Sequence, residues 1–261
     1  MAKVISIVNQ KGGVGKTTSA VNLAAGVGLA GRRVLLADLD PQGNSTSGLG
    51  VNKRGLDKSS YNVLLGEVPA SSAIVSTPYK NLDLLPSTMD LAGAELEMIA
   101  RDNREQLLKK ALALVWETYD FIFIDCPPSL GLITLAALTA SDSLLVPVQC
   151  EYYALEGLSQ LMATIRQIKR LYNPMIELEG VLLTMYDRRL NLTAQVVEEI
   201  KRFFPGKVYA SVIPRNVRLS EAPSYGKPIQ YYDKGSKGAK AYDALAAEFL
   251  DAQDLPDPAV D

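Results

Sequence analysis

The feature that most limits the possible folds is NQKGGVGKTT at residues 9–18, which joins a short apolar run to a segment with helical periodicity. Three glycines within four positions allow positive φ angles and a close approach of the backbone to a ligand. Backbone N–H groups of such a loop, and of the helix after it, can surround phosphate oxygens. A Gly-rich turn without function is the alternative. The strand before the loop and the helix after it favour a nucleotide phosphate loop.

Two lysines of this loop have separate expected roles. In the pattern G-x-x-x-x-G-K-[ST], Lys16 reaches the β- and γ-phosphates and the Thr17 hydroxyl binds Mg²⁺. Gln10 replaces the first glycine of the pattern, and the remaining glycines still supply the positive φ angles. Lys11 is an additional cation, which can stabilise the charge that spreads over a transferred γ-phosphoryl group. A solvated loop lysine is the alternative for Lys11.

Three aspartates at the ends of apolar runs are candidates for the Mg²⁺ side of the site. Asp38 and Asp40 lie two apart in LLADLDPQGN, so both project from one face of a strand end. Asp125 ends FIFID and matches the acidic residue that follows a hydrophobic strand in P-loop ATPases. Carboxylates at the carboxyl ends of parallel strands lie where α/β folds bind their ligands. One of the first pair would hold Mg²⁺ through water and the other would orient the attacking water; a turn or cap carboxylate is the alternative for each.

Short β-branched runs alternate with longer helical patterns along most of the chain. Continuous apolar runs suit a parallel sheet covered on both faces, and their alternation with helices predicts right-handed crossovers. We expect a single doubly wound, mostly parallel α/β sheet with helices on both faces, the P-loop NTPase fold, over residues 1–251. An acidic, Pro-containing disordered tail is expected over 252–261. The expected strands are 3–8, 33–40, 82–87, 120–125, 143–148, 177–186 and 210–214, and the expected helices are 16–30, 90–117, 131–140, 154–172, 191–204 and 238–251.

Composition excludes several kinds of chemistry. The chain has no histidine, so proton transfer near neutral pH falls to Asp, Glu, Lys or positioned water. Its two cysteines, Cys126 and Cys150, are expected to be buried thiols in a reducing compartment. We expect a cytoplasmic protein without a membrane partner, because no signal peptide is evident and no apolar run reaches the ~18 residues of a membrane span.

Six segments together resemble the ParA/Soj chromosome or plasmid partitioning ATPases, within the deviant-Walker-A class that also holds MinD and the nitrogenase iron protein. The segments are KGGVGKTT, LLADLDPQGN, FIDCPPSLG, PVQCEYYALEGL, GVLLTMYD and IPRNVRLSEAPSYGKP. The resemblance covers residues 3–250. It implies ATP and Mg²⁺ as cofactors and an ATPase activity that is slow alone and stimulated by a partner.

The resemblance also implies roles for individual residues. Lys11 is similar to a signature lysine that crosses a dimer interface to the partner's phosphates. Asp40 matches the residue that supports hydrolysis, and Asp38, Asp125 and Thr17 match the Mg²⁺ side. The implied ATP contacts are Lys11, Gly12, Gly13, Val14, Gly15, Lys16, Thr17, Thr18, Met185, Pro214 and Asn216, and the implied interface of an ATP-dependent homodimer includes Lys11, Glu151 and Tyr152.

A basic stretch at 188–240 is a candidate DNA-binding region. It holds 11 Lys and Arg against 4 Asp and Glu, a local charge of +7, whereas the whole chain has a charge of −2. A solvated basic face is the alternative. By resemblance, Arg189 and Arg218 match positions that touch non-specific double-stranded DNA, with Lys201, Arg202 and Lys227 as neighbours, and contacts would go to phosphates. The same resemblance implies a ParB-type centromere-binding partner and association with the nucleoid. It also implies that this chain lacks the N-terminal helix-turn-helix of some ParA relatives, since its first strand begins at once.

Three rival functions share parts of this pattern. A MinD-like membrane ATPase would need a basic amphipathic C-terminal helix, whereas this C-terminus is acidic and contains prolines. A nitrogenase-like iron protein would need cysteines placed to bridge a cluster between subunits, and neither cysteine is well placed for that. A P-loop ligase or small-molecule kinase would share the phosphate loop without predicting ATP-dependent dimers or DNA binding.

Overall fold

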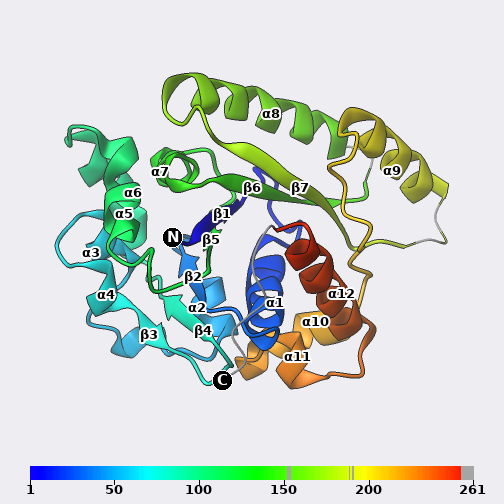
Figure 1. The fold of residues 1–261 in the computed structure, drawn as a ribbon, viewed down its shortest axis with the longest axis horizontal. Coiled ribbons are helices and arrows are strands. Elements are labelled where there is room, and N and C mark those ends of the chain that lie inside the picture. The colour runs from blue at the N-terminus through cyan, green and yellow to red at the C-terminus, as the bar shows by residue number, and fades with distance from the viewer. Residues whose placement is uncertain (152–153, 188, 190, 254–261) are drawn as a thin grey trace.

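The computed structural model describes residues 1–151, 154–187, 189 and 191–253. Seven strands form one sheet in the order β3-β4-β2-β5-β1-β6-β7, and every neighbouring pair is parallel except β3 with β4 (Figure 1). The phosphate-loop strand β1 is therefore central, with β5 on one side and β6 on the other. The strands are β1 (Lys3–Ile7), β2 (Val34–Asp38), β3 (Val75–Ser76), β4 (Leu82–Leu85), β5 (Phe121–Asp125), β6 (Ser143–Gln149) and β7 (Glu177–Thr184).

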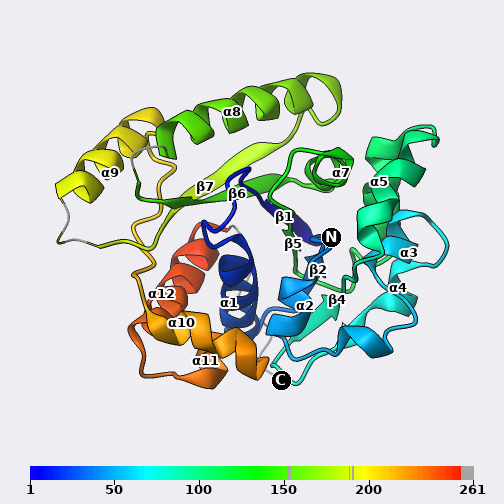
Figure 2. The ribbon, with the colours of Figure 1, turned by 180° about the vertical axis from the view of Figure 1, so that it is seen from behind.

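Helices cover both faces of the sheet, which confirms the expected doubly wound α/β fold (Figures 1 and 2). Successive strand residues face opposite layers. In β5, for example, Ile122 and Ile124 belong to one buried cluster, and Phe121 and Phe123 to the other. The helices are α1 (Lys16–Leu29), α2 (Asn44–Gly48), η1 (Lys53–Gly55), α3 (Ser60–Leu64), α4 (Ala70–Ala73), α5 (Leu91–Ile99), η2 (Arg104–Gln106), α6 (Leu107–Ala113), α7 (Leu132–Ala140), α8 (Ala154–Leu171), α9 (Asn191–Phe203), α10 (Val217–Glu221), η3 (Ala222–Tyr225), α11 (Ile229–Tyr232) and α12 (Lys237–Asp251).

Two expected elements differ in the structure. The strand expected at 210–214 is wrong: the segment follows the edge strand β7 through a few hydrogen bonds and one isolated bridge, Tyr186 with Pro214, and forms no regular ladder. Pro214 has no N–H to donate, which interrupts the pairing. The single helix expected at 90–117 is divided into α5, η2 and α6. Asn103 adopts φ 51° between them, a left-handed conformation that Asn tolerates and that ends a helix.

Helices α1 and α12 pack closely against each other beneath the phosphate loop. A Cβ atom on Gly26 of α1 would lie 2.8 Å from the Cβ atom of Ala246 on α12, so glycine is needed for the two helices to approach this closely. One consequence is that Tyr242 of α12, fully buried, meets Ser19 of α1 at an Oη–Oγ distance of 3.1 Å. Helix α12 is thereby fixed beneath the helix that carries the phosphate loop.

Gln253 closes the described part of the C-terminus. Its side chain accepts a 2.7 Å hydrogen bond from Lys3 Nζ and donates one of 2.8 Å to Glu179. Residues 254–261 of the expected tail lie outside the described residues. None of the helices in the described ranges has the length and apolar character that a membrane crossing requires.

Candidate functional site

The phosphate loop has the backbone geometry that its glycines predict. Gly13 and Gly15 adopt φ angles of 73° and 89°, and Gly15 is the left-handed residue at the N-terminus of α1. A substitution at either position would strain the backbone. Thr184 Oγ1, at the end of β7, donates a 2.8 Å hydrogen bond to the carbonyl of Val14 and so holds the loop against the sheet.

Lys16 is buried beneath this loop and points to its inner side. Its side chain is only 7% exposed, and Nζ donates a 3.2 Å hydrogen bond to the Lys11 carbonyl. Burial lowers the pKa of Lys16, while the charges of Asp125 and Asp40 and the neighbouring Cys126 oppose that change. An ammonium held among carboxylates with one backbone acceptor has remaining donors for an anionic ligand.

The expected Mg²⁺-side carboxylates come together at the carboxyl end of the sheet. Asp38 and Asp125 are register partners on the neighbouring strands β2 and β5, and both are fully buried. Asp40 lies two residues beyond, 7% exposed, and its backbone N–H donates to Asp38 at 3.1 Å. The structure therefore brings Asp38, Asp40 and Asp125 to one edge of the sheet, where the sequence predicted the ligand, and Asp125 and Asp40 are close enough to Lys16 to affect its pKa.

These residues fit a divalent cation. Burial raises the pKa of Asp125 to about 7, assisted by the charge of Asp38, and burial raises the pKa of Asp38 to about 6. Oδ1 of Asp125 is buried without a hydrogen-bond partner among the described residues. An unpaired buried carboxylate oxygen is costly unless a cation or water meets it, and Mg²⁺ prefers oxygen ligands of this kind. Thr17, half-buried at the start of α1, is the neighbouring hydroxyl, and it is close enough to Asp125 to oppose the rise in the pKa of that carboxyl.

Helix α2 was not predicted from the sequence, yet it orients both carboxylates. Ser45 Oγ donates to Asp125 Oδ2 at 2.8 Å, and Thr46 donates to Asp38 Oδ2 from both its N–H and its Oγ1, at 2.8 and 2.7 Å. A carboxylate with one oxygen fixed presents the other in a defined direction. The run GNST directly after the Asp40–Pro41 turn was the available signal, since Ser and Thr hydroxyls commonly bond to groups near turns.

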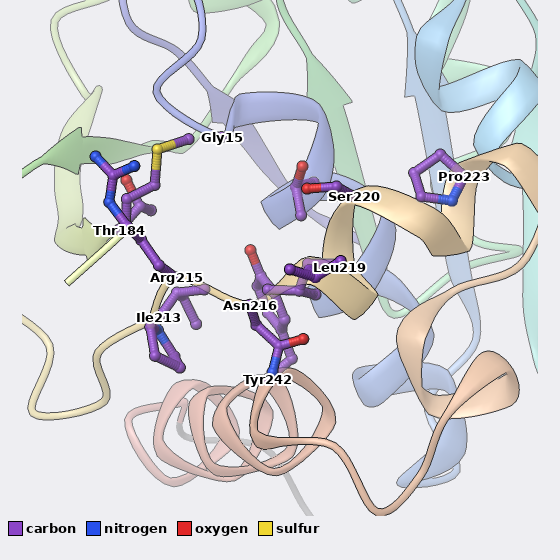
Figure 3. A pocket seen from close by; sticks show the side chains of 13 residues that line it. Gly15, Thr184, Ile213, Arg215, Asn216, Leu219, Ser220, Pro223 and Tyr242 are labelled. Atoms are coloured by element: carbon purple, nitrogen blue, oxygen red, sulfur yellow. The ribbon is translucent and has the colours of Figure 1, made fainter. Parts of the chain in front are cut away.

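A cavity of about 550 Å³ continues from the loop along α1 (Figure 3). Its walls come from β7, the 213–217 segment, α10 and α12, as the side chains of Thr184, Asn216, Leu219 and Tyr242 show (Figure 3). Five of the expected ATP contacts line it: Gly15, Thr18, Met185, Pro214 and Asn216. Ser220 and Tyr242 also line the cavity and were not predicted. Tyr242 lies on α12, and helical periodicity alone gives no sign that this helix closes the site.

Lys11 lies at the exposed rim of the loop and is held within its own chain. Its N–H donates to Asn9 Oδ1 at 2.9 Å, and its Nζ pairs with Glu151 Oε2 at 2.9 Å. Glu151 also faces Arg215, whose guanidinium lies 4.0 Å from Oε1. The two expected interface residues Lys11 and Glu151 are thus in contact, and the third, Tyr152, lies outside the described residues.

The candidate DNA contacts are exposed, and several carry an acidic partner. Arg189 binds Asp187 through Nε and Nη2 at 2.9 and 2.6 Å, and Arg218 pairs with Glu221 at 2.8 Å. Lys201 and Arg202 lie at the end of α9, whereas Arg218 is on α10 and Lys227 follows η3. Helices α9 and α10 lie on the same side of the molecule in both views, α9 above α12 and α10 below it, so these five residues are not one compact patch (Figures 1 and 2).

Comparisons with known proteins agree with this architecture. A family model described as an AAA domain matches residues 2–178. The sporulation initiation inhibitor protein Soj of Bacillus subtilis is 57% identical over 248 residues, covering 95% of this chain and 98% of its own. The chromosome partitioning protein ParA of Myxococcus xanthus is 52% identical, covering 96% of this chain and 88% of its own. A solved structure described as cobyrinic acid a,c-diamide synthase from Mycobacterium smegmatis, with ADP and magnesium bound, is 41% identical with a TM-score of 0.84, covering 96% and 94%.

Proposed function

The chain belongs to the Soj/ParA family of chromosome-partitioning ATPases, and we propose that it is a Mg²⁺-dependent ATP switch. In this proposal it dimerises around ATP, binds DNA as the dimer and responds to a ParB-type centromere-binding protein. The observation that carries the proposal is the buried pair Asp38 and Asp125 at the end of the sheet, where Asp125 lies near Lys16 and its Oδ1 has no hydrogen-bond partner among the described residues, next to a cavity lined by the phosphate-loop residue Gly15.

ATP binding follows from two parts of the site. The loop N–H groups and Lys16 bind the phosphates, with the α1 N-terminus adding its favourable dipole. The cavity between Met185 and Asn216 takes the adenine, with Tyr242 beneath it. Thr17, Asp38 and Asp125 would hold Mg²⁺, which neutralises charge on the β- and γ-phosphates when it is bound. Ser45 and Thr46 hold the two carboxylates in the orientation that this requires.

Hydrolysis is assigned to Asp40, which lies next to the Mg²⁺-side pair and close enough to Lys16 to affect its pKa. Its Oδ1 accepts a 2.9 Å hydrogen bond from the Gln42 N–H, so the carboxylate is oriented by the following turn. An aspartate held in this way can orient a water for attack on the γ-phosphorus. It does not contribute to adenine or loop contacts, so binding and turnover are separable.

Dimerisation is assigned to the rim of the loop. Lys11 is solvent-exposed, and its only side-chain partner among the described residues is Glu151, itself half-exposed. An exposed ion pair of this kind contributes at most about 1 kcal/mol, so Lys11 can leave it for a stronger ligand. A second subunit facing this rim would present γ-phosphate oxygens to Lys11, which would then act in trans in the manner of an arginine finger.

DNA binding and nucleoid association are assigned to exposed basic residues of 188–240. Phosphate contacts from two subunits add in free energy, so the ATP-bound dimer should bind duplex DNA far more tightly than the monomer. Hydrolysis would then release the dimer from DNA, and a ParB-type partner that accelerates hydrolysis would control where this happens.

The test is a DNA-binding titration with the Asp40→Ala dimer in ATP, in ADP and without nucleotide, each over a range of salt concentrations. Binding should require ATP, show no sequence preference and weaken by about 0.9 log units per log unit of salt for each phosphate contact. Arg218→Glu should weaken binding and flatten that slope while leaving ATP affinity unchanged. DNA affinity that is independent of nucleotide would contradict the proposal.

The alternative function is that of a small-molecule synthase, because one similar solved structure is described as cobyrinic acid a,c-diamide synthase. The relatives named Soj and ParA are more similar, at 57% and 52% identity, and favour partitioning. The same titration separates the two: a small-molecule synthase would bind ATP without ATP-dependent affinity for DNA.

A further inference from the structure

A second cavity, of about 590 Å³, shares the residues Pro214 and Arg215 with the adenine cavity. Its lining consists of Tyr186, Asp187, Arg189, Pro214, Arg215 and Lys237. We propose that this basic cavity binds a backbone phosphate of duplex DNA, with Arg215 and Lys237 as the contacting residues. The inference rests on the DNA binding proposed above and names a site for it that the basic stretch alone does not indicate.

Charge makes this cavity suitable for an anion. Among the described residues, three cationic side chains and one carboxylate line it. Arg189 is already neutralised, since Asp187 accepts two hydrogen bonds from its guanidinium and one from its N–H. The Lys237 side chain is exposed, and its ammonium makes no hydrogen bond or ion pair within the described ranges of the chain. Among the described lining residues, the uncompensated positive charge therefore belongs to Lys237 and Arg215.

Arg215 is positioned to share its charge with a phosphate. Its nearest acidic neighbour, Glu151, is 4.0 Å from Nη2 and is more tightly paired with Lys11, at 2.9 Å. In the close view of the adenine cavity, which Arg215 also lines, its side chain extends towards Thr184 (Figure 3). A guanidinium with free donors binds phosphate oxygens in a bidentate manner, and an ammonium alongside it adds a point charge.

The basic cavity is next to the adenine cavity, so binding of DNA and binding of nucleotide can affect each other. Pro214 and Arg215 line both this cavity and the adenine cavity, so one short backbone segment separates the two ligands. Hydrogen bonds from the Tyr186 N–H to Ile213 O and from the Ile213 N–H to Leu183 O fix that segment against β7. Occupation of one cavity can then favour occupation of the other, and thermodynamic linkage makes such an effect reciprocal.

The experiment uses full-length Asp40→Ala protein with ATP and a short duplex of arbitrary sequence. Lys237→Gln and Arg215→Gln are compared with Lys109→Gln, the same charge change on an exposed residue of α6. Because a dimer loses two contacts per substitution, each cavity variant should lower the log–log salt slope by about 1.8 and weaken binding by about 60-fold at 0.1 M salt. Lys109→Gln should bind as the parent does, and Lys237→Arg should restore most of the affinity.

The outcomes separate the two proposals. If the parent binds DNA with ATP dependence but Lys237→Gln and Arg215→Gln retain its affinity and slope, the cavity is not a DNA site and the proposed function stands. If the parent binds no DNA, the proposed function itself fails. A third arm titrates inorganic phosphate by calorimetry: phosphate binding that Lys237→Gln abolishes, with unchanged DNA affinity, would assign the cavity to a free anion and overturn the inference.

Discussion

Replacing Asp125 by Asn should stabilise the metal-free protein at high pH while weakening its response to Mg²⁺ and ATP. Asp125 is fully buried, and burial raises its pKa from 3.8 to about 7. At about 1.4 kcal/mol per pKa unit, the ionised carboxylate costs the folded state about 4 kcal/mol. Asparagine has the same shape, can still accept the Ser45 hydrogen bond, and carries no charge.

The sign of the pH dependence follows from the raised pKa. Below about pH 4 Asp125 is protonated in both the folded and the unfolded protein, so the cost of burying the ionised carboxylate is absent. As pH rises from about 4 to about 7, the folded state keeps a proton that the unfolded state loses, so the free energy of unfolding falls. Between pH 5 and pH 8 the wild-type protein should lose about 3 kcal/mol through this group, and Asp125→Asn should not.

The Asn side chain also brings a destabilising contribution, but that contribution does not change with pH. The Asn amide would occupy the position of the unpaired Oδ1 and lack an acceptor, which costs about 1–3 kcal/mol. That cost is independent of pH and cancels when the variant's effect is compared at the two pH values. Relative to the wild type, the free energy of unfolding of Asp125→Asn should be about 1–3 kcal/mol higher at pH 8. At pH 5 it should be roughly equal or slightly lower.

The assay is urea unfolding in EDTA at pH 5 and pH 8, with Asp57→Asn as the control for an exposed carboxylate. Addition of Mg²⁺ and ATP at pH 8 should stabilise the wild type more than Asp125→Asn, because the variant lacks one of the expected Mg²⁺ ligands. A variant whose effect is the same at both pH values, or more destabilising at pH 8, would refute the reasoning that Asp125 is held as a costly buried anion for the cation.

Three further expectations concern the loop and its neighbours. Lys16→Ala should abolish ATP binding in calorimetry, because it removes the buried cation at the phosphates; wild-type affinity would exclude that role. Asp40→Ala should bind ATP and dimerise in light-scattering measurements but hydrolyse slowly, whereas a monomer with normal turnover would contradict its assignment. Lys11→Ala should bind ATP as a monomer, and mixing it with Lys16→Ala should restore some ATPase activity. Failure of confirmed mixed dimers to recover any activity would favour action of Lys11 within one subunit.

The local sequence was enough to predict the phosphate loop and the sheet around it. Gly13 and Gly15 require backbone conformations that only glycine adopts easily, and this requirement is visible in the sequence. The continuous apolar runs that became β1, β2, β5 and β6 predicted a parallel sheet, and the carboxyl ends of such strands must share one edge. Asp38 and Asp125 could therefore be assigned to one site although 87 residues separate them.

Local preferences were less informative where long-range packing competes with them. The apolar segment 210–214 reads as a strand, but it lies at the sheet edge beyond β7, where Pro214 cannot complete a ladder. The helical pattern of 90–117 gave no boundary at Asn103. Helix α2, too short to be recognised from periodicity, depends on the carboxylates that its residues Ser45 and Thr46 bind.

The sequence by itself thus determined the chemistry of the loop and the edge of the sheet where it occurs. Only the tertiary structure brought Tyr242 of α12 beneath the adenine cavity, Glu151 to Lys11, and Lys237 beside Arg215. The conformation of the loop depends on residues adjacent in sequence, so it can be predicted locally. The tertiary arrangements involve residues 22 to 223 positions apart, which local sequence does not relate to each other. They exist because buried faces of the helices pack on the sheet in one arrangement, such as the close approach of α1 and α12 at Gly26, and sequence periodicity identifies a buried face without identifying what it packs against.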